Sequence, residues 1–388
     1  MVNLAQERQS SAQGESRTVA LPSRLPSLTG MRFIAAALVF FYHSTWIWQN
    51  LFASPNAKGN TFALFSQGGS AGVGFFFVLS GFVLTWAIRP KDTPATFWRR
   101  RFFKIYPNHL VTFVAAAILI GASSKYVIDG WYAVSNLLLV QSYFPQIAIR
   151  NNFNPVAWSL SCEALFYLSF PFLMAAIGRI RAERLWFWAG GVAAAIIAIP
   201  TVAALLPEKP AFPGMGFDEA DLWFIFQFPP VRMLEFVFGI ILARIVLSGR
   251  KLPLGVGGAV ALSVAAYAMA PLFPGTYSFA ALMVIPLGLV IAAGAAADVN
   301  GERTWLASRP MVWLGEVSFA FYMCHYLILM YSHDWFGADR SYGTPGAIAV
   351  LAGLFGATLL AAWLLYSFVE RPLMRRLSTA RRPATESV

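Results

Sequence analysis

The stretch MRFIAAALVFFYH, residues 31–43, is an apolar run that contains one arginine and one histidine. A run of this kind predicts a helix buried in lipid. A charged side chain at the centre of a bilayer costs at least about 2.5–3.5 kcal/mol, so Arg32 and His43 are candidate functional residues. At about 100° and 1.5 Å per residue, they project from the same helical face and lie roughly 16 Å apart. For His43 alone, the structural alternative is a polar group that holds helices together.

The composition of the chain indicates an integral membrane protein. Of its 388 residues, 58% are hydrophobic and only 12% are charged, whereas soluble proteins carry roughly 25% charged residues. Residues 1–27 are polar and lack the apolar core of a signal peptide, so we expect a disordered cytoplasmic tail. Residues 28–370 form the predicted membrane domain, and residues 371–388 form a second, basic cytoplasmic tail. Cys162 and Cys324 both lie in apolar runs, which favours packing over a disulfide.

The apolar runs predict an all-α protein with about ten transmembrane helices. Runs long enough to cross about 30 Å of hydrocarbon lie near 30–48, 68–88, 107–124, 157–178, 185–206, 222–247, 253–271, 276–297, 310–332 and 345–369. An eleventh run, 131–144, is ambiguous by length alone. We find no internal repeat in the chain.

The basic residues decide the orientation, because cytoplasmic loops carry the excess of lysine and arginine. Ten crossings with both termini in the cytoplasm place nearly all basic residues inside, including the runs at 89–106 and 179–184. A full crossing at 131–144 would reverse this pattern, so we expect that segment to be re-entrant or interfacial. The net charge of +11 then follows from topology and from attraction to anionic lipid. A nucleic-acid partner is not needed to explain it.

Two further titratable residues fall at about the same predicted depth as His43, in the outer half of the membrane. They are Glu163 in NPVAWSLSCEALFYL and His325 in SFAFYMCHYLI. A carboxylate that holds the second nitrogen of an imidazole raises its basicity, as expected for a general base. His43, Glu163 and His325 are therefore the candidate catalytic residues. The spacing of histidines and acids predicts no metal site.

Other polar positions are open to two interpretations. Arg232 and Glu235 are spaced to neutralise each other on one helix, as a structural pair or as site residues. The run WRRRFFKIYP, residues 98–107, suits either lipid headgroups or a phosphorylated ligand. Glycine and serine in GFFFVLSGF, residues 74–82, indicate close helix packing. Ser80, Ser159 and Ser161 are candidate acyl carriers that the spacing does not rank.

Seven stretches, in this order, resemble the membrane-bound acyltransferase-3 family. They are LPSLTGMRFIAAALVFFYH, GVGFFFVLSGF, RRRFFKIYP, WSLSCEALFY, RMLEFVFG, SFAFYMCH and VERP, and the resemblance covers residues 26–375. The family moves acyl groups from acyl-coenzyme A to hydroxyls of envelope sugars, glycolipids or macrolides. One departure is Lys104, which stands where the family pattern has an arginine. Lysine offers charge to a phosphate but not a bidentate fork.

The resemblance implies a role for each candidate residue. Arg32, Arg100, Arg101 and Lys104 would hold the nucleotide end of acyl-CoA, and its pantetheine arm would extend along the first helix toward His43. His43 would take the proton of the acceptor hydroxyl, and Glu163 would orient His43. The supporting residues would be Ser80, Trp158, Ser159, Arg232, Glu235 and Tyr322. Acyl-CoA would be a co-substrate, and no cofactor or metal would be bound.

The predicted function is thus transfer of an acetyl or short acyl group to a macrolide-type natural product or a sugar, in a bacterial inner membrane. One alternative is an acceptor in an envelope polysaccharide or glycolipid. An alternative from a different class of protein is a multi-pass transporter, which would also contain buried histidine, glutamate and arginine. Transporters more often show inverted repeats. The sequence leaves open the acyl length, the identity of the acceptor and whether the chain forms a homo-oligomer.

Overall fold

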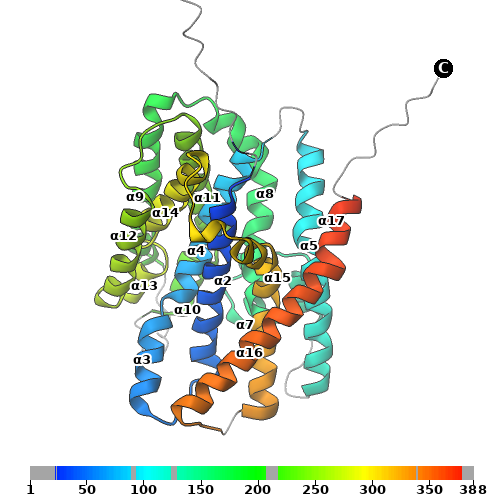
Figure 1. Cartoon of the computed structure of the whole chain (residues 1–388). Coiled ribbons are helices and arrows are strands. Elements are labelled where there is room, and N and C mark those ends of the chain that lie inside the picture. Colours follow the sequence, from blue (N-terminus) through cyan, green and yellow to red (C-terminus); the bar gives the residue numbers. More distant parts are fainter. Residues whose placement is uncertain are drawn as a thin grey trace, which may run out of the picture.

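The chain folds into a bundle of long helices whose axes are roughly parallel, and α16 crosses the others obliquely (Figure 1). The computed structural model describes residues 22, 24–88, 93–123, 129–206, 217–337 and 340–377. The bundle helices are α2 (Pro26–Ile47), α4 (Gly68–Trp86), α5 (Pro94–Ser123), α8 (Trp158–Ile177), α9 (Leu185–Ala203), α11 (Pro229–Leu247), α12 (Val256–Met269), α14 (Val284–Val299), α15 (Arg309–Ser332) and α16 (Thr344–Leu365). Shorter helices are α3 (Pro55–Phe65), α6 (Gly130–Leu137), α7 (Ile147–Arg150), α10 (Glu219–Asp221), α13 (Gly275–Ser278) and α17 (Arg371–Leu377).

Each of the ten predicted membrane segments overlaps one of the bundle helices. By length and apolar composition, six helical stretches within the described residues can cross a membrane: Pro55–Trp86, Pro94–Ser123, Pro155–Ile177, Ala182–Ala203, Arg309–Gly337 and Thr344–Leu377. Two further apolar helices, Val256–Leu272 and Val284–Val299, are shorter. The all-helical membrane character is therefore supported, while the number of crossings and the side of the termini stay predictions.

The predicted segment 222–247 is not one helix, which corrects the sequence interpretation. A π-helical turn, η5 (Leu222–Gln227), is followed by a break at Phe228, and α11 begins at Pro229. Phe228 is extended, with ψ of 117°, because a residue that precedes proline avoids the helical region. The break orients the buried Arg232 and Glu235 on a new helix.

The tails and one loop also differ from expectation where the structure describes them. The predicted N-terminal tail ends earlier, because Ser27 already lies in α2, where its N–H and hydroxyl both donate to Asp298. Residues 371–377 form α17, and the rest of the C-terminal tail lies outside the described residues. Helix α3 was not predicted; Ser54 caps it by accepting the Ala57 N–H.

The segment 131–144 forms only a short helix and a 3-10 turn. Helix α6 has eight residues, which at 1.5 Å per residue cover about 12 Å. This length is less than half of the hydrocarbon thickness, so the segment is too short to cross a bilayer as a helix. Cys162 is buried and Cys324 is half-buried, and both are free, as expected.

Helix α2 runs through the middle of the bundle and packs against α4 and α15. Helix α4 in turn crosses α11 at two glycines that let the backbones touch. A Cβ on Gly81 would lie 2.0 Å from the Phe236 carbonyl oxygen, and one on Gly239 would lie 1.9 Å from that of Val78. This is the close packing that GFFFVLSGF predicted.

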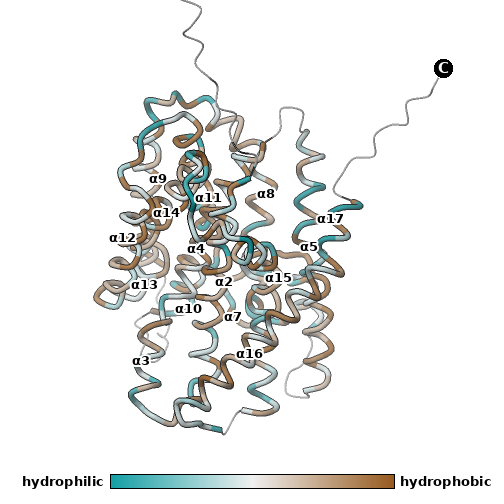
Figure 2. The backbone as a smooth tube through the Cα atoms, viewed as in Figure 1, coloured by the Kyte–Doolittle hydropathy of each residue, from teal (hydrophilic) through white to brown (hydrophobic). Residues whose placement is uncertain are grey.

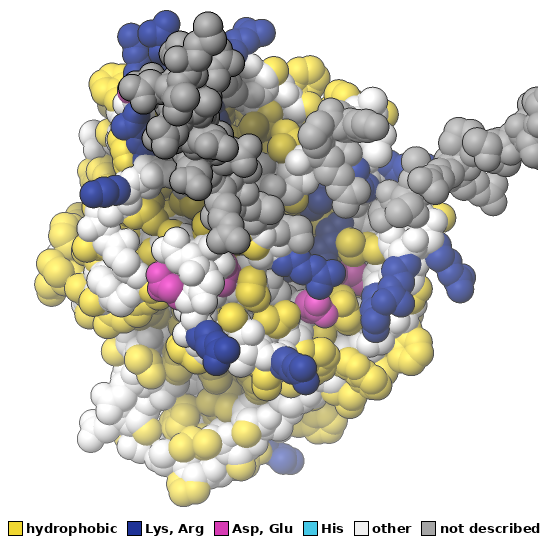
Figure 3. Space-filling model, turned by 45° about the horizontal axis from the view of Figure 1, so that its top comes forward, with side chains coloured by type: hydrophobic (Ala, Val, Ile, Leu, Met, Phe, Trp, Pro, Cys, Tyr) yellow, Lys and Arg dark blue, Asp and Glu magenta, His cyan; other side chains and the backbone are white. Residues whose placement is uncertain are grey.

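Hydrophobic residues predominate along the helix shafts, and the hydrophilic residues gather toward helix ends and loops (Figure 2). Ile118, Phe172 and Phe187 expose 66%, 66% and 78% of their surface, as suits helices that face lipid. Lysine and arginine side chains cluster at the end of the bundle where α17 lies (Figure 3). We call this end the basic end.

Candidate active site

A cavity of about 140 Å³ opens near the basic end, between α2, α4, α5, α8 and α15. Three cationic side chains line it: Arg32 from α2, and Arg101 and Lys104 from α5. Arg100 is not among the lining residues. Phe76, Leu79 and Phe319 are among the apolar walls. The cavity therefore combines a cationic mouth with an apolar interior.

Glu163 lies in this cavity and not beside His43, which corrects the geometry expected from the sequence. Its carboxylate accepts a hydrogen bond from the Tyr167 hydroxyl, 2.7 Å away and one turn further along α8. Both side chains line the cavity together with Ser80 and Arg32. Glu163 thus places a half-buried hydrogen-bond acceptor in the same cavity as the three cationic groups.

The inner end of the cavity is closed by Ser159 and Tyr322. Their hydroxyl oxygens lie 2.8 Å apart, and both residues line the cavity. Trp158 does not line it, but its ring packs edge-on against that of Phe77, which does. The Tyr322 ring centroid lies 5.6 Å from that of His325, so the histidines begin where the cavity ends.

His43 and His325 form a hydrogen-bonded pair. His325 Nδ1 lies 2.6 Å from the Tyr322 carbonyl oxygen, and because a carbonyl only accepts, Nδ1 carries the proton. In the neutral ring, Nε2 is then an acceptor, and it lies 3.0 Å from His43 Nδ1. His43 Nδ1 also lies 3.0 Å from the Val39 carbonyl oxygen, so it must be the protonated nitrogen.

The hydrogen-bond pattern therefore assigns the tautomer of His43. With the proton on Nδ1, the lone pair of the neutral ring is on Nε2. His325 and the Val39 carbonyl fix the orientation of the ring, which is the task that the sequence interpretation gave to Glu163. His43 Nε2 can accept a proton from a hydroxyl that approaches it.

Arg232 and Glu235 form a separate buried pair. Arg232 Nη2 lies 2.8 Å from Glu235 Oε2, and the two side chains are 1% and 3% exposed. The guanidinium also lies over the rings of Phe77 and Phe226, at 5.1 and 5.2 Å from their centroids. Neither charged residue lines the cavity near the basic end, and their position suits the structural interpretation of the pair.

A comparison with protein families identifies the fold family. A family model described as an acyltransferase domain matches residues 25–367, almost the whole chain. The chain belongs to the acyltransferase-3 family. No solved structure matches this acyltransferase.

Several relatives of this acyltransferase have been named. Acyltransferase MdmB of Streptomyces mycarofaciens is 43% identical over 371 residues, covering 93% of this chain and 95% of that protein. Exopolysaccharide production protein ExoZ of Rhizobium meliloti is 29% identical, covering 86% of this chain and 96% of that protein. Peptidoglycan O-acetyltransferase OatA of Listeria monocytogenes is 23% identical, and the match spans 56% of its length.

One site residue of the acyltransferase was missed by residue-level reasoning. Glu370, 1% exposed, forms an ion pair with Lys104 and accepts a hydrogen bond of 2.6 Å from Asn108 Nδ2. The signal was present in the VERP stretch, where an acid directly follows a long apolar run. The sequence alone did not show that this acid folds back onto the basic run.

Proposed function

We propose that the protein is an O-acyltransferase that moves an acetyl or short acyl group from acyl-CoA to a hydroxyl of a macrolide-type natural product or a sugar. The observation that carries the proposal is the lone pair on His43 Nε2, which the contacts with His325 and Val39 imply. The same helix carries Arg32 in the cationic cavity. One helix thus connects a donor site to a general base.

The cavity near the basic end supports the donor half of the proposal. CoA carries several phosphate charges, and Arg32, Arg101 and Lys104 line the cavity. Charge-assisted hydrogen bonds to phosphate are short and strong. Lys104 is already paired with Glu370, so a phosphate would share or replace that carboxylate. The apolar interior suits the pantetheine arm and a short acyl chain.

The proposed reaction is direct transfer. The acceptor oxygen attacks the thioester carbonyl carbon, a C–O ester bond forms, and the C–S bond breaks. His43 Nε2 takes the hydroxyl proton and returns it to the leaving CoA thiolate, so that the products are an ester and free CoA. General-base catalysis of this kind contributes about 10²–10⁴ in rate. His325 positions His43 throughout, through the contact at Nδ1.

Two observations bear on the acceptor. The match with Acyltransferase MdmB covers 95% of that protein, whereas the match with the peptidoglycan O-acetyltransferase covers 56%. The first candidate acceptor in this proposal is a small secondary metabolite such as a macrolide. The full-length match with a protein named for exopolysaccharide production favours the second candidate, an envelope glycan. The transporter alternative gains no support from the acyltransferase family match.

The test is the variant His43→Ala, assayed for acyl transfer and for CoA binding in detergent. We expect transfer to fall by about 10²–10⁴ while CoA binds as in the parent protein. His333→Ala, which changes a histidine at the end of α15 outside the cavity, is the matched control and should keep its activity. Substantial turnover by His43→Ala would contradict the assignment of the base. Comparison by mass of the metabolites and envelope glycans of a deletion strain would identify the acceptor.

A further inference from the structure

A second cavity, of about 350 Å³, lies on the side of the histidine pair away from the basic end. It is bounded by α5, α7, the loop 151–155 and α15. Most of its lining is apolar, and the polar side chains on it are two carboxamides and two phenols: Asn151, Asn152, Tyr326 and Tyr331. None of these residues lines the cationic cavity.

This cavity adjoins the imidazole of His43 through one side chain. The Tyr326 ring lines it, and its centroid lies 5.1 Å from that of His43. A third cavity, of about 420 Å³, is lined by Thr45, Trp48 and Gln49. Among the described residues, no ring that lines this third cavity contacts His43 or His325. Of these two cavities, the Tyr326 cavity is therefore the one that shares a ring contact with the histidine pair.

The wall of the Tyr326 cavity is held in a strained backbone conformation. Phe153 lines it with φ of 57°, a region that costs a non-glycine residue about 1–3 kcal/mol and is concentrated at binding and active sites. Its N–H donates to Asn152 Oδ1 at 2.8 Å, and Asn136 Nδ2 donates to the Asn152 carbonyl at 3.0 Å. Asn154 Nδ2 donates to the Met323 carbonyl at 2.9 Å, which ties the loop to α15 two residues before His325.

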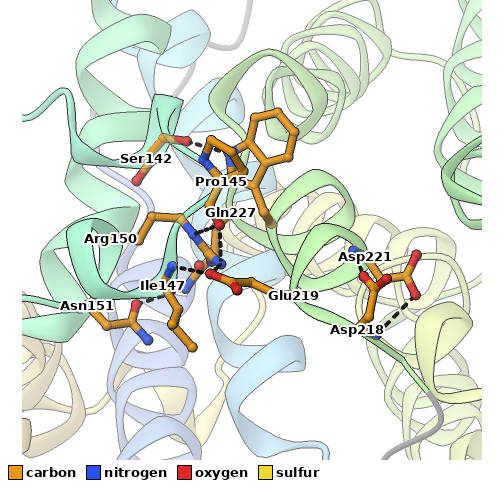
Figure 4. A network of polar contacts seen from close by, with 10 residues as sticks. Ser142, Pro145, Ile147, Arg150, Asn151, Asp218, Glu219, Asp221 and Gln227 are labelled. Atoms are coloured by element: carbon orange, nitrogen blue, oxygen red, sulfur yellow. Dashed lines mark hydrogen bonds and ion pairs between the residues drawn. The ribbon is translucent and has the colours of Figure 1, made fainter. Parts of the chain in front are cut away.

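The opposite wall, α7, is fixed by a buried arginine (Figure 4). Arg150 is fully buried and donates from Nε and Nη2 to the Pro145 carbonyl oxygen, at 3.2 and 3.0 Å. Glu219 lies 3.8 Å from Arg150 Nη2 and accepts the Ile147 N–H. Burial lowers the pKa of Arg150 to about 10, and the Glu219 carboxylate opposes this shift. Arg150 is thus charged at neutral pH, and both walls are preorganised.

We propose that the Tyr326 cavity receives the hydroxyl-bearing acceptor, which enters from the end of the bundle opposite the basic end. This inference rests on the proposed function, because it assigns the cavity to the acceptor of the same reaction. An apolar lining with a few carboxamides and phenols fits a compound with a broad apolar face and a few hydroxyls. A macrolide has this chemistry, whereas an extended glycan would expose more hydroxyls than the lining can satisfy.

The experiment uses a cysteine introduced at the mouth of the cavity. Ala148 is exposed and lines the Tyr326 cavity, and Gly59 is exposed and lines the third cavity. Ala148→Cys and the matched control Gly59→Cys are treated with a membrane-impermeant maleimide, in whole cells and in detergent. The parent, whose Cys162 is buried, is treated in parallel. Transfer from acetyl-CoA to a macrolide and the Kd for CoA are then measured for each protein.

We expect modified Ala148→Cys to lose about 100-fold in kcat/KM for the macrolide, because displacement of a reacting group by about 1 Å costs on this order. Its Kd for CoA should not change. The macrolide should slow maleimide labelling of Ala148→Cys, and CoA alone should not. Modified Gly59→Cys should keep its transfer activity.

Two results would overturn the inference: modified Ala148→Cys that transfers as fast as the unmodified variant, or labelling that the macrolide does not slow. Failure of the proposed function looks different. In that case the parent protein would transfer no acyl group, while protection of Ala148→Cys by the macrolide would still mark the cavity as a binding site.

Discussion

At the scale of single residues, the central finding is that one imidazole orients another. His325 donates from Nδ1 to the Tyr322 carbonyl and is left with an acceptor nitrogen, which meets His43 Nδ1 at 3.0 Å. Glu163, the residue expected to do this from its predicted depth, instead accepts from Tyr167 in the cationic cavity. A neutral partner leaves His43 a weaker base than a carboxylate would, but it selects the same tautomer.

The role of His325 can be tested by two substitutions. His325→Ala removes one of the two acceptors for His43 Nδ1 and leaves the Val39 carbonyl. We expect kcat to fall by about 10–100-fold while KM for acyl-CoA stays the same. His325→Gln offers an amide oxygen in place of the imidazole nitrogen and should recover part of the loss. The measurement is steady-state kinetics on purified protein. Equal losses in both variants, accompanied by a raised KM, would indicate a merely structural role.

A double variant can separate the effect of Lys104 on stability from that of the buried Glu370 charge. Lys104→Ala leaves the Glu370 carboxylate buried with Asn108 as its one remaining hydrogen-bond partner within the described part of the chain. Loss of one partner of a buried pair costs about 3–5 kcal/mol. Lys104→Ala combined with Glu370→Gln removes this charge and should restore the unfolding temperature in detergent.

The same double variant then tests the donor site. Each lost charge-assisted contact to phosphate is worth about 1.5–3 kcal/mol, or about ten- to a hundredfold in the Kd for CoA. Lys104→Arg, which restores a bidentate fork, should bind CoA as tightly as the parent or more tightly. Titrations with CoA and dephospho-CoA provide the measurement. If every variant binds CoA as the parent does, the basic run is a lipid anchor instead.

At the scale of elements, the position of the cavity depends on how closely the helices approach. Helix α4 carries Ser80 and Phe76 into the cavity, and one residue further along, Gly81 lies against the backbone of α11. In a membrane, where lipid is as apolar as a side chain, such close contact is a main source of helix association. Any side chain at Gly81 must push α4 away from α11.

Gly81→Ala should therefore destabilise the bundle by about 1–3 kcal/mol, the usual cost of overpacking. Gly190→Ala is the matched control, because a Cβ there meets nothing within 4 Å; alanine in a helix should be neutral or stabilise it by about 0.5–1 kcal/mol. Thermal unfolding in detergent measures both. Equal unfolding temperatures for the two variants would show that the crossing of α4 and α11 does not limit stability.

At the scale of the whole molecule, charge is distributed unevenly between the two ends. Arginine and lysine gather at the basic end (Figure 3), where Arg244 donates to the carbonyls of Ile177 and Ile180 and Arg250 pairs with Glu183. By the positive-inside rule, we expect this end to face the cytoplasm. The cationic cavity would then open toward the compartment where acyl-CoA is made.

Reporter fusions can test this orientation. Fusions after residues 125 and 145 should both report an extracytoplasmic position, because α6 is too short to cross the membrane between them. A fusion after residue 181 should report a cytoplasmic position. The measurement is the activity of alkaline phosphatase and of a fluorescent protein at each site. Opposite sides for 125 and 145 would make the segment between them a true crossing.

The sequence by itself determined the class of the protein, its all-helical character and the family. These follow from properties of consecutive residues: apolar runs that need about 20 residues to cross a bilayer, and seven short stretches in order, six of which lie within the family match over residues 25–367. It also put Arg32 and His43 on one helical face, because 3.6 residues per turn relates positions within a single helix.

The tertiary structure alone decided which residues meet between helices. Predicted depth placed Glu163, His43 and His325 at one level, but depth does not give the rotation of each helix about its axis. Packing gives that rotation: α8 turns Glu163 toward the cationic cavity, and α15 turns His325 toward His43. The contact of Glu370 with Lys104 spans 266 residues of chain, and the Tyr326 cavity is assembled from α5, α7 and α15. Such contacts depend on how side chains of distant segments fit together, and no local period of the sequence encodes that fit.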